Sequence, residues 1–211
     1  MQTPFMHIQR SVQILLFDDV EVLDFAGPFE VFAVAGGRDG TEPFTVSTVS
    51  PRSGAVRVRG GLSINPTYTF ADCPPGDILL VPGGFGTRAI INDPVVIDWV
   101  RTRAETAELV LSVCSGALVL GSAGLLGGLR ATTHCSAINE LRSVAPTAEV
   151  CSVARVVDNG HIVLSAGVSA GIDLALYIVR RLYGREMACE TARYIEYDWR
   201  EGASNFAGES L

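Results

Sequence analysis

Cys114 is the residue of this sequence best placed to do chemistry, because it stands where two patterns meet within residues 107–126. The first half of this stretch is a short apolar run with β-branched residues, typical of a strand buried on both faces. The second half repeats apolar residues at helical spacing, and Gly116 is small enough for that helix to pack closely. A sharp turn between the two would leave the sulfur above the sheet at a helix N-terminus, which favours a thiolate. We therefore predict a nucleophilic Cys114; the alternative is an ordinary buried thiol.

Asp24 is the carboxyl residue that we expect to hold or pass a proton. It directly precedes a predicted helix, in which Pro28 suits the first turn. Its neighbours Leu23 and Phe25 would draw it toward the interior, where a desolvated carboxyl acquires a raised pKa. The alternative is a helix cap or a solvated loop residue.

A glycine pair, Gly83-Gly84, follows the predicted core strand 77–81. Ligands of open α/β sheets bind outside the carboxyl ends of the strands, and Cys114 ends the next strand along the chain. Backbone N–H groups of the pair could therefore serve as donors to an anion or oxyanion. An ordinary turn is the alternative.

Two further features follow strands. His134 comes after the short strand 130–133, where a histidine serves as a base or, more commonly, as a hydrogen-bonded structural residue. A second glycine-bearing turn, 167–171, follows the strand 162–166 and leads into an apolar helix.

Strands alternate with helices along the chain, which predicts an α/β domain whose mostly parallel sheet is covered by helices on both faces. Asn159-Gly160 predicts a hairpin turn. We expect strands near 11–17, 44–49, 77–81, 109–113, 130–133, 146–150, 154–158 and 162–166, and helices from about 28, from 94, after 115, over 172–183 and over 185–194.

Composition limits the class of protein. With 211 residues, of which 48% are hydrophobic and 18% charged, the chain suits one domain over 1–211 with its core in about 11–200. A net charge of −7 without a basic cluster argues against nucleic acid or membrane as a partner, and it leaves a small molecule. The five cysteines are irregularly spaced, which predicts reduced thiols and neither a disulfide framework nor a metal site. Met1–Arg10 lacks signal-peptide features, so we expect a cytoplasmic protein.

The motifs together resemble the ThiJ/PfpI superfamily and, within it, the isocyanide hydratase family. The resemblance runs from about Val12 to Trp199 and depends on LDFAGP (23–28), VPGG (81–84), VCSG (113–116), RATTH (130–134), GVSAGID (167–173) and IEYD (195–198). It implies a flavodoxin-like sandwich with a cysteine nucleophile elbow. It also implies catalytic roles for Cys114, Asp24 and Ser115, and substrate contacts from Gly83, Gly84, Gly167, Val168 and His134.

The activity that this resemblance implies is the addition of water to an isocyanide through a cysteine thioimidate, giving an N-substituted formamide without a metal or organic cofactor. A homodimer is implied as well. Ser115 stands where protease-like members have histidine, which argues against a Cys-His peptidase, and Cys135 stands where the hydratases have tryptophan.

Other functions remain open. One is a different cysteine enzyme or oxidative-stress protein that acts on small aldehydes or glycated groups. Another is a non-catalytic ligand-binding domain like those of AraC-type regulators, although we find no basic recognition helix for DNA.

Overall fold

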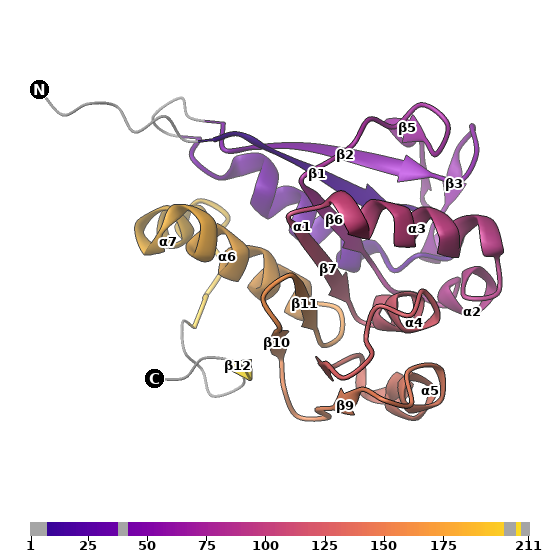
Figure 1. Ribbon diagram of the computed structural model, residues 1–211. Helices are drawn as coiled ribbons and strands as arrows, with labels where there is room; N and C mark the ends of the chain where they lie inside the picture. The colour runs from indigo at the N-terminus through magenta and orange to yellow at the C-terminus, as the bar shows by residue number, and fades with distance from the viewer. Residues whose placement is uncertain (1–7, 38–41, 201–205, 208–211) are drawn as a thin grey trace, which may run out of the picture.

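The computed structural model describes residues 8–37, 42–200 and 206–207, so the signal-peptide expectation for Met1–Arg10 falls mostly outside it. Its centre is an eight-stranded sheet in the order β12-β10-β11-β7-β6-β1-β2-β5, in which only the β10–β11 pair is antiparallel (Figure 1). The strands are β1 (Arg10–Leu15), β2 (Phe44–Ser50), β5 (Tyr68–Thr69), β6 (Ile78–Val81), β7 (Leu109–Val113), β10 (Val156–Asp158), β11 (Ile162–Ser165) and β12 (Phe206–Ala207).

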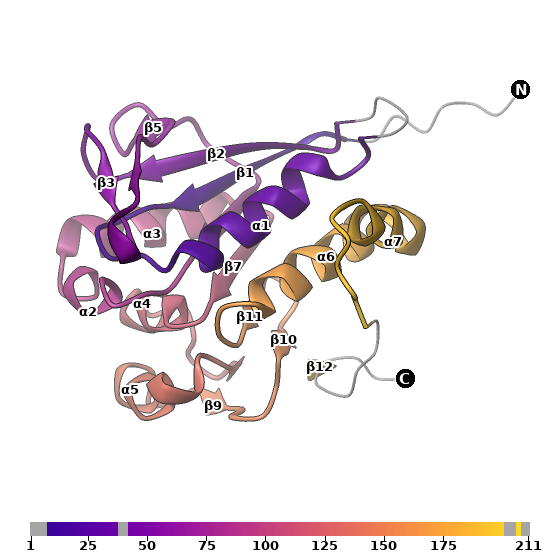
Figure 2. The same ribbon diagram turned by 180° about the vertical axis from the view of Figure 1, so that it is seen from behind.

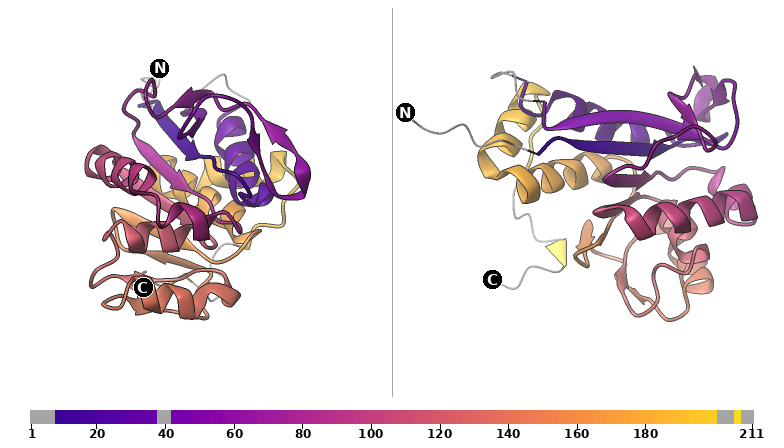
Figure 3. Two further views of the ribbon diagram at one scale, coloured as in Figure 1. Left: turned by 90° about the vertical axis from the view of Figure 1, so that its right-hand side faces the viewer. Right: turned by 45° about the horizontal axis from the view of Figure 1, so that its top comes forward.

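Helices cover both faces of this sheet, as the alternating pattern predicts. On one face lie α1 (Val22–Val34), α6 (Ala170–Tyr183) and α7 (Arg185–Tyr194), which are seen from the front in Figure 2. On the other lie α3 (Pro94–Thr106) and α4 (Gly116–Ser122), and the views in Figure 3 show the sheet between the two layers. The predicted α/β fold class is therefore confirmed.

Smaller elements surround the carboxyl end of the sheet. They are the hairpin β3 (Val56–Arg57) and β4 (Ser63–Ile64) with the 3-10 turn η1 (Arg59–Gly61), the short helix α2 (Thr87–Ile90), the turn η2 (Cys135–Ala137), α5 (Ile138–Val144), and the paired strands β8 (Arg130–Ala131) and β9 (Glu149–Val150).

The core explains why the central strands are apolar on both sides. Every residue of β6 and β7 is buried, because each strand packs against helices above and below the sheet. The two strands pair in parallel, so the turns that follow them lie next to each other. The fold thereby places Gly83-Gly84 beside Cys114.

The predicted start of the first helix is wrong. We expected Asp24 before the helix and Pro28 in its first turn, but α1 begins at Val22, so Asp24 lies in the first turn and Pro28 inside the helix. Proline lacks the N–H that would bond to the carbonyl four residues earlier, which here is that of Asp24. Burial of Phe25 and Val31 in the core keeps this segment helical despite the missing bond.

Other boundaries show what the pattern did not reveal. The helix after Cys114 ends at Ser122, because Gly124 adopts a left-handed conformation with φ 77°, and not at the predicted Gly127-Gly128. Helices α2 and α5 were not predicted. By contrast, Asp93 caps α3 by accepting from the Val95 N–H at 2.9 Å, as expected.

None of the helices in the described part of the chain combines the length and the apolar composition that a membrane span requires. Within the same residues, no three potential ligands among His, Cys, Asp and Glu gather where they could hold a metal ion.

Gly116 tests how tightly the strand-to-helix turn packs. A Cβ at this position would lie 2.1 Å from the Val81 carbonyl oxygen, so Gly116→Ala forces β6 and α4 apart. We expect a loss of about 1–3 kcal/mol in the free energy of unfolding, measured by urea denaturation. The control is Gly127→Ala, whose Cβ meets only Thr147 Oγ1 at 3.6 Å. Equal effects of the two variants would contradict the packing described for Gly116.

Candidate active site

Cys114 forms a strained elbow between β7 and α4. Its φ is 58°, in the left-handed region, which costs a residue with a Cβ about 1–2 kcal/mol. Hydrogen bonds hold this conformation: the Cys114 N–H donates to Ala166 O at 3.0 Å and to Ser165 O at 3.2 Å, and the Thr133 hydroxyl donates to Cys114 O at 2.7 Å. The predicted turn from a buried strand into a helix is therefore present.

The carboxyl group of Asp24 reaches this elbow from α1. Asp24 is fully buried, and its Oδ2 accepts a hydrogen bond from the Gly83 N–H at 3.0 Å. Its Oδ1 is buried without a conventional hydrogen-bond partner among the described residues. The thiol of Cys114 hydrogen-bonds to this carboxyl group and lowers its pKa. Asp24 is thus placed to take the proton of the thiol.

Val168 supplies a second strained turn opposite the first. Its φ is 51°, and it lies between β11 and α6. Its backbone N–H contributes hydrogen bonding that lowers the pKa of Asp24 and also that of Cys114. The thiol and the carboxyl group therefore share a backbone donor.

Burial decides the charge of the pair. Desolvation and, to a lesser degree, the negative charge of Asp24 raise the pKa of the Cys114 thiol to about 12. Backbone hydrogen bonds from Ser115 and Val168 lower this pKa, but by less. Desolvation also raises the pKa of Asp24 to about 6. The predicted thiolate is therefore wrong for the resting protein. Near neutral pH the pair holds one proton on sulfur and one negative charge on Asp24.

The physical reason for this correction is the environment of the sulfur. Cys114 is only 8% exposed, so it loses most of the hydration that a thiolate needs. The helix that follows it, α4, spans seven residues, and its N-terminal field does not outweigh desolvation and the adjacent carboxylate. The pair can still act as nucleophile and base, because Asp24 can accept the thiol proton when a substrate is attacked.

The glycine pair does not provide the oxyanion donors that we predicted. The Gly83 N–H is taken by Asp24, and the Gly84 N–H donates to Ser115 Oγ at 3.0 Å. The Ser115 hydroxyl is in turn 3.1 Å from the Gly84 carbonyl oxygen, to which it donates. Ser115, which is 2% exposed, thus ties the turn after β6 to the elbow, and the catalytic role expected for it stays a prediction.

His134 lies at the wall of the site. Its Nδ1 accepts from the Ser136 N–H at 3.2 Å, which leaves the proton of the neutral ring on Nε2. The ring packs on Gly167, where a Cβ would lie 2.1 Å from His134 Cδ2. Gly167 therefore makes room for the imidazole. Gly83 donates its N–H to Asp24 and leaves room for that carboxyl group. Neither glycine is among the residues that line the cavity, and the substrate contacts expected for them stay predictions.

A cavity of about 350 Å³ opens on the Cys114 sulfur. Five predicted residues line it: Gly84, Cys114, Ser115, His134 and Val168. Asp24 lies behind this wall. The sequence did not reveal the other lining residues, because they come from separate loops and helices: Glu21, Arg59, Phe85, Arg88, Ser136 and Ala137. Only Phe85, an aromatic residue directly after a glycine pair, carried a sequence signal.

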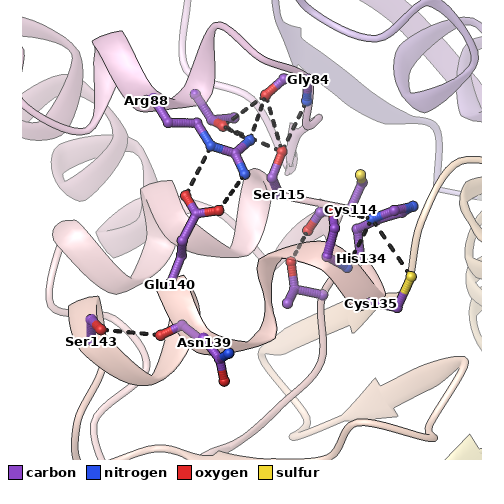
Figure 4. A network of polar contacts seen from close by, with 12 residues as sticks. Gly84, Arg88, Cys114, Ser115, His134, Cys135, Asn139, Glu140 and Ser143 are labelled. Atoms are coloured by element: carbon purple, nitrogen blue, oxygen red, sulfur yellow. Dashed lines mark hydrogen bonds and ion pairs between the residues drawn. The ribbon is translucent and has the colours of Figure 1, made fainter.

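The two arginines at the cavity are both paired. Arg88 forms a bidentate ion pair with Glu140 of α5 at 2.9 and 2.7 Å and donates to the Gly84 carbonyl at 3.2 Å (Figure 4). Arg59 lies 3.4 Å from Glu21 and stacks 4.6 Å from the ring centre of Phe85. The wall thus carries no unbalanced cation, which favours a neutral ligand.

A larger cavity, about 460 Å³, lies between residues 50–56 and the start of α3. Its lining includes Asp18, Arg52 and Asp93 but no cysteine or histidine. We place the active site at the smaller cavity, because it alone of the two has a nucleophile with a base beside it.

A left-handed cysteine between a buried parallel strand and a helix, with a carboxyl group at the sulfur, defines an α/β protein of the nucleophile-elbow class. More narrowly, the chain belongs to the DJ-1/PfpI family, whose model matches residues 10–181. This is the ThiJ/PfpI group that the sequence motifs resemble, so that expectation is confirmed, together with its flavodoxin-like fold.

The relatives of this chain include an enzyme and several transcriptional regulators. Isonitrile hydratase of Pseudomonas putida is 38% identical over 188 residues, which cover 89% of this chain and 78% of that protein. The HTH-type transcriptional regulator CdhR of Pseudomonas aeruginosa is 29% identical over 88% of this chain, but the matched part spans only 54% of the regulator.

Solved structures agree on the fold. A THiJ/PfpI family protein from Pseudomonas syringae has a TM-score of 0.82 at 31% identity, with 96% of this chain and 80% of that chain covered. DJ-1beta of Drosophila melanogaster has a TM-score of 0.78 at 23% identity, and the match covers 91% of this chain and 100% of that chain. At this identity the likeness supports the fold alone.

The raised pKa of Asp24 predicts that this carboxylate destabilises the folded protein. Its pKa is 3.8 ordinarily and about 6 in the fold, so the folded state loses stability as pH rises through this window. At pH 7 the cost is about 3 kcal/mol, at 1.36 kcal/mol per pH unit of pKa difference. Asp24→Asn should therefore raise the free energy of unfolding at neutral pH by up to this amount and remove the pH dependence between about pH 4 and 6.

Urea denaturation at pH 5 and pH 7.5 measures this effect. The control is Asp98→Asn, since the Asp98 side chain is 69% exposed and forms a surface ion pair with Arg101 at 2.6 Å. An Asp24→Asn variant no more stable than the wild type at pH 7.5 would contradict a strained, buried carboxylate.

Proposed function

We propose that this protein adds water to an isocyanide and releases an N-substituted formamide. One observation carries the proposal: a buried thiol lines a cavity, a carboxyl group lies directly behind it, and the two groups together hold a single proton. The 38% identity to an isonitrile hydratase over 89% of the chain supports the choice of substrate class. Cys114 is the nucleophile and Asp24 the proton carrier.

In the first step, the Cys114 sulfur attacks the terminal carbon of the isocyanide while Asp24 takes the thiol proton. A carbon–sulfur bond forms, and the carbon gains the electron pair. Asp24 then returns its proton to that carbon, which gives a thioimidate and a carboxylate. A carboxyl group whose pKa is about 6 suits both transfers near neutral pH.

In the second step, Asp24 takes a proton from water as the water oxygen adds to the thioimidate carbon. The nitrogen receives this proton, so a tetrahedral intermediate with a hydroxyl and an amine group forms. Its carbon–sulfur bond breaks, the hydroxyl proton passes to the sulfur, and the formamide leaves. One water is consumed, and the thiol is restored.

The cavity suits this substrate class. Isocyanides are uncharged, and both arginines of the wall are engaged by carboxylates, so binding a neutral molecule leaves no ion unpaired. A volume of about 350 Å³ lies at the small end of the range for ligand pockets. We expect small alkyl isocyanides to fit.

We further propose that the protein acts as a homodimer in the cytosol. Phe85 is 65% exposed at the cavity, and Leu62, on the same hairpin as Arg59, is 52% exposed. Such apolar side chains suit a contact with a second copy. All five cysteines are free thiols, as a reducing compartment requires. A light-scattering mass of one chain would contradict the dimer.

Turnover of a simple alkyl isocyanide tests the proposed function. We expect the wild type to form the formamide, Cys114→Ala to form none, and Asp24→Asn to be slower by a factor of about 10² to 10⁴. Activity should fall below about pH 6, because protonated Asp24 cannot take the thiol proton. Chromatography of the formamide measures each rate, and Cys151→Ala, a half-buried thiol away from the cavity, should match the wild type.

Other outcomes distinguish the remaining functions. Turnover of methylglyoxal without turnover of isocyanide would replace the proposal with an aldehyde-directed cysteine enzyme. Inertness toward both, with a metabolite retained on purification, would favour a ligand-binding domain like the matched part of the CdhR regulator.

A further inference from the structure

The turn that carries Val168 is anchored by a polar network that the proposed chemistry does not use. Arg155 Nε donates to Asp173 Oδ2 at 2.7 Å, and the Tyr197 hydroxyl donates to the same oxygen at 3.1 Å. Asp173, in the first turn of α6, is only 8% exposed. Tyr197 lies in the segment that follows α7, and this segment turns back across α6 (Figure 2).

Arg155 connects this network to both ends of the turn. Its Nη2 donates to Ser169 Oγ at 3.2 Å, directly after Val168. Its carbonyl oxygen accepts from the Ala166 N–H at 2.9 Å, two residues before Val168. A left-handed Val168 between these two points needs such support, because a β-branched residue disfavours that conformation.

We propose that Tyr197, Asp173 and Arg155 are positioning residues that set the Val168 N–H against Cys114 and Asp24. This inference rests on the proposed role of Cys114 as nucleophile, and it gives the C-terminal segment a part in the site. Tyr197 lies beyond residues 10–181, which the family model matches. None of the three lines the cavity, so each acts through the backbone of the turn.

The chemistry of the three groups fits this role. Burial, with the carboxylate of Asp173, raises the pKa of Tyr197, so its hydroxyl keeps its proton and remains a donor. Asp173 Oδ2 therefore accepts from a neutral phenol and from a guanidinium at once, which fixes the side chain of Arg155. Without the phenol, Asp173 is held by fewer bonds, so Arg155 and the turn that it supports gain freedom.

Tyr197→Phe tests the inference by the alkylation of Cys114 with iodoacetamide from pH 5 to 9. Peptide mass spectrometry separates Cys114 from the other four cysteines. In the wild type, we expect the rate to fall below a midpoint near pH 6, where Asp24 becomes protonated. Weaker donation by Val168 raises the pKa of both groups, so the midpoint should move up by about half a pH unit and the rate at pH 5, below the midpoint, should fall about threefold.

The matched control is Tyr177→Phe on α6, the helix that carries Asp173. The Tyr177 hydroxyl donates to Asp158 Oδ2 at 2.6 Å, and Asp158 pairs with Arg181 at 3.2 Å. This arrangement repeats the phenol, carboxylate and guanidinium set at the other end of β11, away from the turn. Tyr177→Phe should leave the midpoint of the wild type unchanged.

Ser169→Ala is a second variant, at an exposed position, which removes the side-chain bond from Arg155 to the turn and leaves the backbone bond from Ala166 in place. It should shift the midpoint in the same direction, and it keeps the test decisive if Tyr197→Phe fails to fold. The charged and titratable groups that line the cavity, Glu21, Arg59, Arg88 and His134, are unchanged in all these variants.

Two results would overturn the inference: an unmoved midpoint in a folded Tyr197→Phe or Ser169→Ala protein, or an equal shift in Tyr177→Phe. Failure of the proposed function is distinguishable, because alkylation of Cys114 does not depend on which substrate the protein turns over. A shifted midpoint in a protein inert toward isocyanides would leave the positioning network intact and reject isocyanide hydration alone.

Discussion

The contact between the Asp24 carboxyl group and the Cys114 thiol is the constraint on which the site depends. Both groups can carry a negative charge, and both are buried, so the site admits one charge and not two. Desolvation separates their pKa values, to about 6 for the acid and about 12 for the thiol. The proton therefore rests on sulfur, and the base stands beside it.

This contact requires three segments distant in sequence to meet at one edge of the sheet. Asp24 comes from the first turn of α1, Cys114 from the end of β7 and Val168 from the end of β11. The parallel pairing of β11 with β7 brings the two strained turns together. Their left-handed residues are unfavourable alone, and hydrogen bonds such as that from Thr133 to the Cys114 carbonyl hold one of them. Strain and a buried charge are thus concentrated at the cavity.

The sequence predicted what local pattern determines. Alternating apolar runs predict the sheet and its two helical layers, Asn159-Gly160 predicts the β10–β11 hairpin, and α7 has the expected bounds of 185–194. Cys114 was found because the change from a strand pattern to a helix pattern is visible in the chain. These features depend on neighbours in sequence, so they need no knowledge of the packed fold.

What the sequence did not predict depends on tertiary packing. The charge of Cys114 follows from its burial and from a carboxylate ninety residues away, and neither is visible in the helix that follows it. The N–H groups of Gly83 and Gly84 are occupied by side chains from α1 and from the elbow. The wall residues Arg59 and Arg88 come from different loops and helices, each with its own acidic partner.

Ultraviolet absorbance of the thiolate, titrated in the wild type and in Cys114→Ala, tests the central claim most directly. The difference between the two titrations isolates Cys114 from the other four cysteines. A thiol whose pKa is about 12 predicts no difference in thiolate absorbance below about pH 10. A step in the difference at or below about pH 8 would contradict the account, because the resting charge would then lie on sulfur and not on Asp24.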